Sequence, residues 1–243
     1  MRRTLPPVVM VTLGLLAGCP VEPTAADDGE CGSWISAQRG DSLDGERLAE
    51  LSGLAASHRY PDVLWAINDG GHAPAVYAID REGLTRGAFS LAGVEAEDWE
   101  DLAVGPCPAA AGACSCLYVA DTGDNERVRE TGVILRFPEP DLEEEGSVDG
   151  VATGVEALWF AYPGERHDAE ALLVDPGSGE VVVVTKAMPG EQTAVFAFPT
   201  ALPAATTESA PAVLDEVALL DLEHLDDLDS PRVTAGDASP RGI

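Results

Sequence analysis

Asp98, Glu100 and Asp101 stand close together in the motif DWEDLAVGP, which turns apolar directly after the last acid. Carboxylates this close repel one another unless a cation or an arginine lies between them. Calcium accepts roughly six to eight oxygen ligands in loose geometry, and carboxylates supply them. The motif therefore predicts either a metal site or an arginine contact, for which Arg127 and Arg129 are the candidates.

Two more polar motifs offer the same type of ligand. The motif DTGDN contributes Asp121, Asp124 and Asn125, and the motif HDAE contributes Asp168 and Glu170. Together with the three acids of DWED, these residues form a set of oxygen ligands that suits Ca²⁺. The alternative is that Asp and Asn cap turns with their own backbone, while the glycine of DTGDN supplies a positive φ. The acid spacing of DTGDN differs from that of helix-loop-helix calcium loops, so no motif match favours the metal.

The other polar candidates are two histidines, a lysine and the turn NDGGH. His72 and His167 are candidate catalytic residues, because free imidazole changes its charge near neutral pH. Asn68 and Asp69 are candidate binding residues, although the glycines of NDGGH explain a turn without any ligand. Lys186, the only lysine in the chain, is a third candidate binding residue, and it is expected to form a salt bridge or, alternatively, to act in catalysis. Motifs of serine hydrolases, phosphate-binding loops and zinc proteases are missing from the sequence, so those activities lack support.

Short apolar runs bounded by Gly, Pro and Asp predict an all-β fold that positions these residues. The runs recur in three passes of four, namely SGLAAS, VLWAIND, AVYAID and GAFSL, then EDLAVG, CLYVAD, VILRF and VEALWFA, then EALLVD, EVVVVT, AVFAF and EVALLDL. Three four-stranded units with tight turns are typical of β-propeller blades, and half of a sandwich or barrel is the alternative. The fold expected is therefore propeller-like, with about three blades.

The repeat also predicts which positions correspond. Trp65, Tyr118 and Val183 are expected to be equivalent, and a second equivalent set comprises Asn68, Asp121 and Lys186. In a meander, the loops that enter the first strand and the loops that leave the second lie on the same face. All the polar motifs above fall in those loops, so we expect them to meet at one mouth.

Propellers have at least four blades, so the three passes predict an incomplete ring. VTAGDASP, from Val233 to Pro240, is expected to begin a fourth first strand, which predicts a chain truncated at its C-terminus. Residues 33–49 are expected to supply the outer strand that closes such a ring. A dimer whose chains complete each other, or an open three-blade fan, is the alternative.

Residues 1–18 combine Arg2 and Arg3 with a short apolar run, which is typical of an export signal. The run ends in LAGC, which resembles the lipobox of bacterial lipoproteins and implies cleavage before Cys19 and lipid attachment to its sulfur. The resemblance implies a protein anchored to the cell envelope, and Pro20 favours the outer membrane. Residues 19–32 are expected to form a tether, and residues 33–243 the folded domain.

Four cysteines remain after Cys19. Export favours disulfides over a metal site. Two extended residues at positions i and i+2 lie too far apart to bond, which argues against a Cys114–Cys116 pair. Cys107 then bonds with one of those two, and a Cys107–Cys116 bond would pin the excursion CPAAAGACSC. The partner of Cys31 stays open.

The chain carries 43 acidic and 14 basic side chains, for a formal net charge of −29. Such a surface repels nucleic acid and anionic lipid headgroups and attracts cations, which excludes DNA and RNA as partners. Acidity that only keeps an exported protein soluble is the alternative explanation.

The ordered motifs ELSGLAAS, LWAINDGG, DWEDLAVGP, LYVADTGDN and DAEALLVDP, across residues 50–240, resemble a group of secreted bacterial propeller-like proteins. More distantly, the chain is similar to gluconolactonase-type and phytase-like propellers, which hold calcium at the channel mouth. The first hypothesis is therefore a lipid-anchored module that binds a small molecule, a glycan or a protein through a calcium-organised face. The alternatives are a calcium-dependent hydrolase of a lactone, ester or phosphoester, and a non-functional fragment of a longer propeller.

Overall fold

The computed structural model describes residues 43, 45, 47–109, 115–143, 146–188, 190–222 and 232–238. The expectations for the export signal, for Cys19, Cys31 and Cys114, and for the tether fall outside these residues. Within them the chain is all-β and has no α-helix, as the sequence predicts. No helix in the described ranges is long and apolar enough to cross a membrane.

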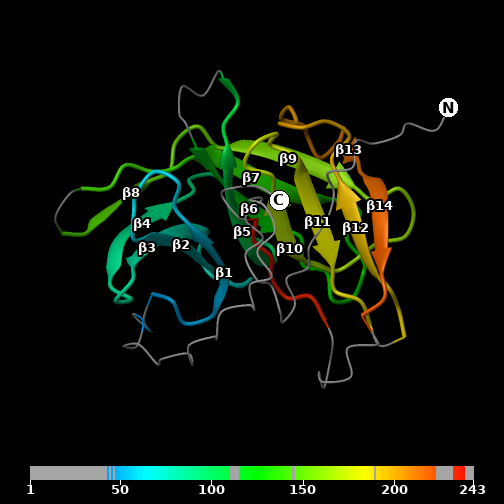
Figure 1. The fold of residues 1–243 in the computed structure, drawn as a ribbon, viewed down its shortest axis with the longest axis horizontal. Helices are drawn as coiled ribbons and strands as arrows, with labels where there is room; N and C mark the ends of the chain where they lie inside the picture. Colours follow the sequence, from blue (N-terminus) through cyan, green and yellow to red (C-terminus); the bar gives the residue numbers. More distant parts are fainter. Residues whose placement is uncertain are drawn as a thin grey trace, which may run out of the picture. The chain divides into compact units, whose positions relative to one another are not determined.

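The strands form three sheets, and each sheet follows the chain as an antiparallel meander (Figure 1). The first sheet contains β1 (Leu51–Ala56), β2 (Val63–Asn68), β3 (Ala75–Asp80), β4 (Thr85–Ser90) and, beyond β4, β8 (Val148–Val151). The second contains β5 (Trp99–Pro106), β6 (Ser115–Asp121), β7 (Gly132–Pro138), β9 (Glu156–Ala161) and, beyond β9, β13 (Ala212–Val213). The third contains β10 (Ala169–Val174), β11 (Val181–Thr185), β12 (Thr193–Ala197) and β14 (Asp215–Leu220). All twelve strands predicted from the repeat are present.

The outermost strands β8 and β13 were not expected. Both pair in parallel, β8 with β4 and β13 with β9. They are short and have no fully buried residue, so they lack the apolar alternation that identifies a strand in a sequence. The prediction of an outer strand within residues 33–49 is wrong for the described part, which forms turns and coil. Leu48 there packs instead against Ala66 and Ile79.

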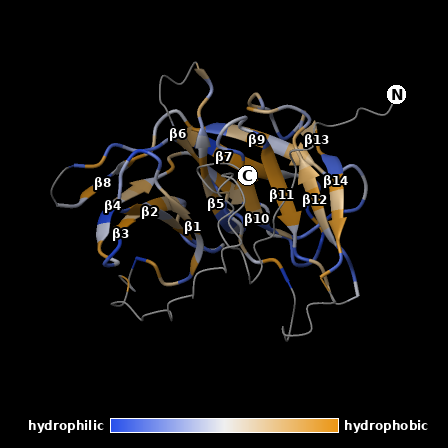
Figure 2. Ribbon diagram, viewed as in Figure 1, coloured by the Kyte–Doolittle hydropathy of each residue, from blue (hydrophilic) through white to orange (hydrophobic). Residues whose placement is uncertain are grey.

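Two apolar cores join the three sheets. β6 contributes to both, because successive side chains of a strand point to opposite faces. Leu117 and Val119 belong to the core shared with the first sheet, and Tyr118 and Ala120 belong to the core shared with the third. Figure 2 shows β11, a run of four valines, in hydrophobic colour, and its residues are all buried. Among the innermost strands, β5 contacts both β1 and β10, and Figure 1 shows the three nearest the middle of the view.

The ladders establish which residues of the three sheets are equivalent. Each inner strand begins opposite the last residue of the second strand, and a register shift follows, at the pairs Leu51↔Asn68, Trp99↔Asp121 and Ala169↔Thr185. In each sheet, the residue that follows the second strand donates its backbone N–H to the carbonyl of the residue that precedes the inner strand. These hydrogen bonds run from Asp69 to Glu50, from Thr122 to Asp98 and from Lys186 to Asp168. The expected register of the third repeat is therefore wrong by one residue. Thr185 and Val182, rather than Lys186 and Val183, match Asp121 and Tyr118, because the valine run carries no landmark that fixes its register.

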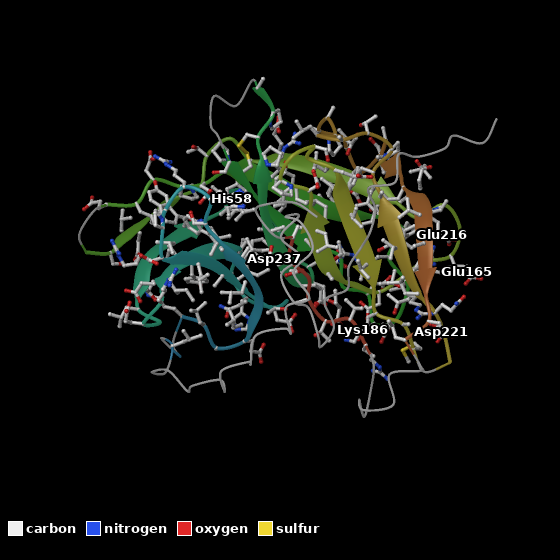
Figure 3. The ribbon with its side chains drawn as sticks, viewed as in Figure 1. His58, Glu165, Lys186, Glu216, Asp221 and Asp237 are labelled. Atoms are coloured by element: carbon white, nitrogen blue, oxygen red, sulfur yellow. A yellow bond between two sulfur atoms is a disulfide. The ribbon has the colours of Figure 1, made fainter. Side chains whose placement is uncertain are left out.

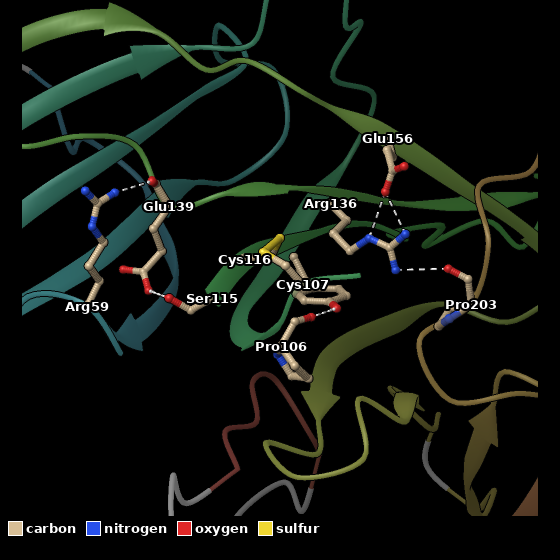
Figure 4. The surroundings of a disulfide bond; sticks show 10 residues. Arg59, Pro106, Cys107, Ser115, Cys116, Arg136, Glu139, Glu156 and Pro203 are labelled. Atoms are coloured by element: carbon tan, nitrogen blue, oxygen red, sulfur yellow. Dashed lines mark hydrogen bonds and ion pairs between the residues drawn. A yellow bond between two sulfur atoms is a disulfide. The ribbon is translucent and has the colours of Figure 1, made fainter. Parts of the chain in front are cut away.

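Cys107 and Cys116 form a disulfide between the end of β5 and the start of β6 (Figure 4). The Tyr118 hydroxyl donates to the Pro106 carbonyl at 2.6 Å beside it. The predicted pair is therefore confirmed, and it closes a short loop across one hairpin.

Replacing both cysteines by serine should lower the free energy of unfolding. The bond spans a sequence separation of 9 residues. The chain entropy released by opening a loop of that size corresponds to about 2.5–3 kcal/mol. Urea unfolding of the double variant, compared with the wild type with and without reductant, measures the loss. A change below about 0.5 kcal/mol would show that the bond does not constrain the unfolded chain.

Candidate functional site

The polar motifs meet at one pocket of about 360 Å³, as the meander argument predicts. The residues that line it are Leu51, Ser52, Asp69, Asp98, Glu100, Asn125, Glu170, Lys186 and Thr234. All of them except Thr234 come from the starts of the inner strands and from the loops that follow the second strands, which lie at the same edge of an antiparallel sheet. Figure 3 marks Lys186 just beyond the end of β11.

Five carboxylates gather at this pocket in two groups that share one member. Asp69, Asp98 and Glu100 form the first group, and Glu100, Asp168 and Glu170 form the second. Within each group the nearest carboxylate oxygens lie within 4.8 Å of one another. This spacing is suited to ligands around a single cation. We call these residues the acidic cluster.

Glu100 is the shared centre of the acidic cluster. Its side chain is only 6% exposed, and no hydrogen bond to its carboxylate comes from any described residue. Burial, and next the charges of Glu170 and Asp98, raise the pKa of Glu100 to about 9. Burial and the charge of Asp69 likewise raise the pKa of Asp98. The cluster therefore has an unbalanced negative charge when all its members are ionised.

Two loop glycines approach the acidic cluster so closely that no side chain fits. A Cβ on Gly70 would lie 2.4 Å from the nearer Asp98 oxygen, and a Cβ on Gly123 would lie 2.3 Å from Glu100 Oε1. Gly123 is not among the glycines with positive φ. Its role is this close approach, and not the positive φ that the turn-capping alternative assigns to it.

Asp121 and Asp124 use their carboxylates on the backbone. Asp121 accepts the N–H groups of Glu97 and Asp98 at 2.9 and 3.1 Å, and it pairs with Arg129. Asp124 accepts the N–H groups of residues 128 and 129, both at 2.8 Å. The Asp124 contacts match the turn-capping alternative, whereas Asp121 bonds a loop that is distant in the sequence. Neither residue belongs to the acidic cluster. Asp121 fixes the backbone that carries Asp98.

The two candidate arginines are engaged elsewhere. Arg127 pairs with Glu191, and Arg129 pairs with Asp121 and Glu97 and donates to the Gly123 carbonyl at 2.9 Å. No described arginine or lysine forms an ion pair with an acid of DWED. The expected arginine contact is therefore not formed as an ion pair, although the charge of Arg129 opposes the rise in the pKa of Asp98.

Asp101 does not line the pocket. It is 1% exposed and accepts three backbone N–H groups, from Leu102 and Leu172 at 2.8 Å and from Gly236 at 3.0 Å. Burial raises its pKa to about 7, although the three hydrogen bonds oppose the rise. Asp101 thereby ties β5 to β10 and to the described residues 232–238, which carry Thr234. Those residues form no strand in the structure, so the predicted fourth first strand is not formed there.

The remaining candidates lie in different places. Asn68 is buried and holds the chain before β1, since its side chain donates to the Arg47 carbonyl and accepts the Glu50 N–H. His72 Nδ1 lies 3.2 Å from the Asp69 carbonyl oxygen, and its ring is not part of the pocket lining.

His167 packs against Tyr162 and Phe196 outside the pocket. Burial, and then Arg127, lower its pKa. Lys186 lines the pocket and donates a hydrogen bond to Glu170, which is the salt bridge expected from the sequence.

Sequence reasoning missed Ser52, Thr234 and Leu51 as pocket residues. Ser52 is the position in β1 that corresponds to Glu100 in β5, and its hydroxyl donates to the Glu100 backbone carbonyl at 2.6 Å. The repeat could have identified Ser52 through this equivalence. Thr234 had no such signal, because its segment does not continue the repeat as a strand.

The chain matches no model of a known protein family, and no curated protein is significantly similar to it. The function must therefore be argued from the chemistry of the pocket.

Proposed function

We propose that the protein is an exported, lipid-anchored binding module that holds Ca²⁺ in the acidic cluster and presents it to a ligand at the pocket. The ligand is a small molecule, a glycan or a protein. The three sheets, each with its inner strand against its neighbour's, are proposed to be blades of a propeller-like fold. Lipid attachment at Cys19 and the resemblance to secreted propellers support the location, and both remain predictions.

The observation that carries the calcium proposal is the buried, unpartnered Glu100 at the centre of the cluster. An isolated buried carboxylate is costly, and a hard cation with oxygen ligands offsets that cost. Gly70 and Gly123 lie so close to the carboxylates of Asp98 and Glu100 that a side chain at either glycine would displace them. Asp69, Asp98 and Glu100 would hold the ion, with Asn125 as a further oxygen donor in the lining.

Binding is favoured over turnover by the composition of the pocket. Neither His72 nor His167 belongs to the described residues that line it. A hydrolase would need another group to move protons, and the Lys186 ammonium already bonds Glu170. The pocket is thus better equipped to hold an ion and a ligand than to act on one.

Thermal unfolding in chelator and then in excess calcium tests the proposal. Calcium at roughly a hundred times its dissociation constant should add about 2.7 kcal/mol to the folded state. For a domain of this size that is a rise in melting temperature of about 5–10 °C. Glu100→Gln should abolish the rise, while Glu82→Gln, which removes an exposed acid between β3 and β4, should keep it. A wild-type melt that calcium leaves unchanged would refute the proposal.

Asp121→Asn should weaken calcium binding without removing the site. The substitution loses the charge that pairs with Arg129 and one acceptor for the backbone before Asp98. Changes to residues that orient a metal ligand typically cost about 10- to 100-fold in affinity. Calorimetric titration measures the loss, and Asp215→Asn, an exposed acid on β14, is the charge-matched control. Complete loss of binding would instead make Asp121 a ligand.

A further inference from the structure

The two groups of the acidic cluster occupy equivalent places at successive sheet boundaries. Trp99 is the first residue of β5 and pairs with the last residue of β6. Ala169, the first residue of β10, pairs in the same way with the last residue of β11. Asp98 and Glu100, which flank Trp99, therefore correspond to Asp168 and Glu170. The second group thus repeats these two acids of the first, one sheet further along the chain, whereas Asp69 corresponds by the same register to Thr122 and not to Glu100.

The two groups differ in what balances their charge. No ion pair to Asp69, Asp98 or Glu100 comes from the described lysine and arginines. In the second group, the Lys186 ammonium hydrogen-bonds the Glu170 carboxylate, which is buried. Asp168, the other acid there, accepts the Asp124 N–H at 2.9 Å. The second group thus already contains a cation.

We infer that Lys186 occupies the second of two equivalent cation positions, so that the protein binds one calcium ion, at Asp69, Asp98 and Glu100, and supplies its own ammonium group at the other. This inference rests on the proposed function, because it takes the first group to be a calcium site. The carboxylates alone do not carry it. Glu100 is more than nine-tenths buried as a residue, and its carboxylate has no hydrogen-bond partner among the described residues. It lines the pocket as the member that the two groups share, which points to a bound cation.

The matching chemistry explains the arrangement. An ammonium group is a compact point charge on a flexible stem, so it can replace a metal ion next to a carboxylate. Unlike an ion, it stays attached and leaves no coordination position for a ligand. The protein would then have one exchangeable ion at the pocket and one fixed charge beside it.

Counting the calcium ions bound per chain tests the inference. Equilibrium dialysis of the whole protein against radioactive calcium should give one ion for the wild type and two for Lys186→Met, which keeps the length of the side chain and removes its charge. The double variant Lys186→Met/Glu170→Gln keeps the net charge of the wild type and removes a carboxylate from the second group. It should bind one ion again.

The outcomes separate the inference from the proposed function. One ion in both the wild type and Lys186→Met, or two ions in the wild type, overturns the inference and leaves the calcium site intact. No ion in the wild type overturns both. If Lys186→Met does not fold even in calcium, Lys186→Gln, which also removes the charge, takes its place in the count, and one ion bound to that variant would contradict the assignment of Lys186.

Discussion

Asp101→Ala should destabilise the protein by about 3 kcal/mol or more, because it leaves three backbone N–H donors of the interior without an acceptor. The donors lie on β5, on β10 and in residues 232–238. β10 and residues 232–238 each also supply a pocket residue, Glu170 and Thr234. The loss corresponds to a fall in melting temperature of about 6–12 °C for a domain of this size. Chemical unfolding of the variant at neutral pH measures it.

The two carboxylate oxygens of Asp101 make a graded control possible. Oδ1 accepts the Leu102 N–H, whereas Oδ2 accepts those of Leu172 and Gly236. Asp101→Asn retains one oxygen, which can keep the two longer-range bonds while the amide group faces the Leu102 N–H. We therefore expect the free energy of unfolding of Asp101→Asn to lie between that of the wild type and that of Asp101→Ala. Equal stability of Asp101→Ala and the wild type would show that these bonds do not hold the inner strands together.

The apparent affinity for calcium should rise steeply with pH. In the folded protein without metal, the pKa of Glu100 is raised to about 9 from an ordinary value of 4.5. Below the raised pKa the carboxyl keeps a proton that calcium must displace, so the affinity gains up to about tenfold per pH unit. Calorimetric titrations between about pH 6 and pH 8, in buffers of different ionisation enthalpy, measure the affinity and the protons released.

The protonation of Glu100 also determines how the free energy of unfolding changes with pH when a chelator removes calcium. Between the ordinary and the raised pKa, the folded state binds more protons through Glu100 than the unfolded state does. The free energy of unfolding therefore falls as pH rises through this window. Calcium, which replaces the proton, should flatten that slope. An affinity that is constant over the same pH range would contradict the placement of Glu100 at the ion.

The arrangement of the strands could be predicted because it depends on local pattern. Apolar runs separated by Gly, Pro and Asp mark all twelve main strands, and the meander then requires their polar loops to share one edge. Local geometry also limits the disulfide, since Cys114 and Cys116 are too far apart to bond each other, which leaves Cys107 to bond with one of them. β8 and β13 could not be predicted in this way, because each pairs in parallel with a strand that is distant in the sequence.

The division of labour among the acids could not be predicted. Asp98, Asp101, Asp121 and Asp124 have the same side chain in similar motifs, yet only Asp98 joins the acidic cluster. The other three satisfy backbone N–H groups whose positions depend on how separate loops and sheets pack. The role of Gly123 is equally non-local, because the Glu100 carboxylate that excludes its side chain lies on another strand.

Anomalous diffraction from crystals grown in calcium would locate the bound ion. We expect one calcium peak within coordination distance of the carboxylates of Asp69, Asp98 and Glu100, and its disappearance in Glu100→Gln. A map with no peak at these residues, or with the ion at Asp121 and Asp124 instead, would contradict this expectation.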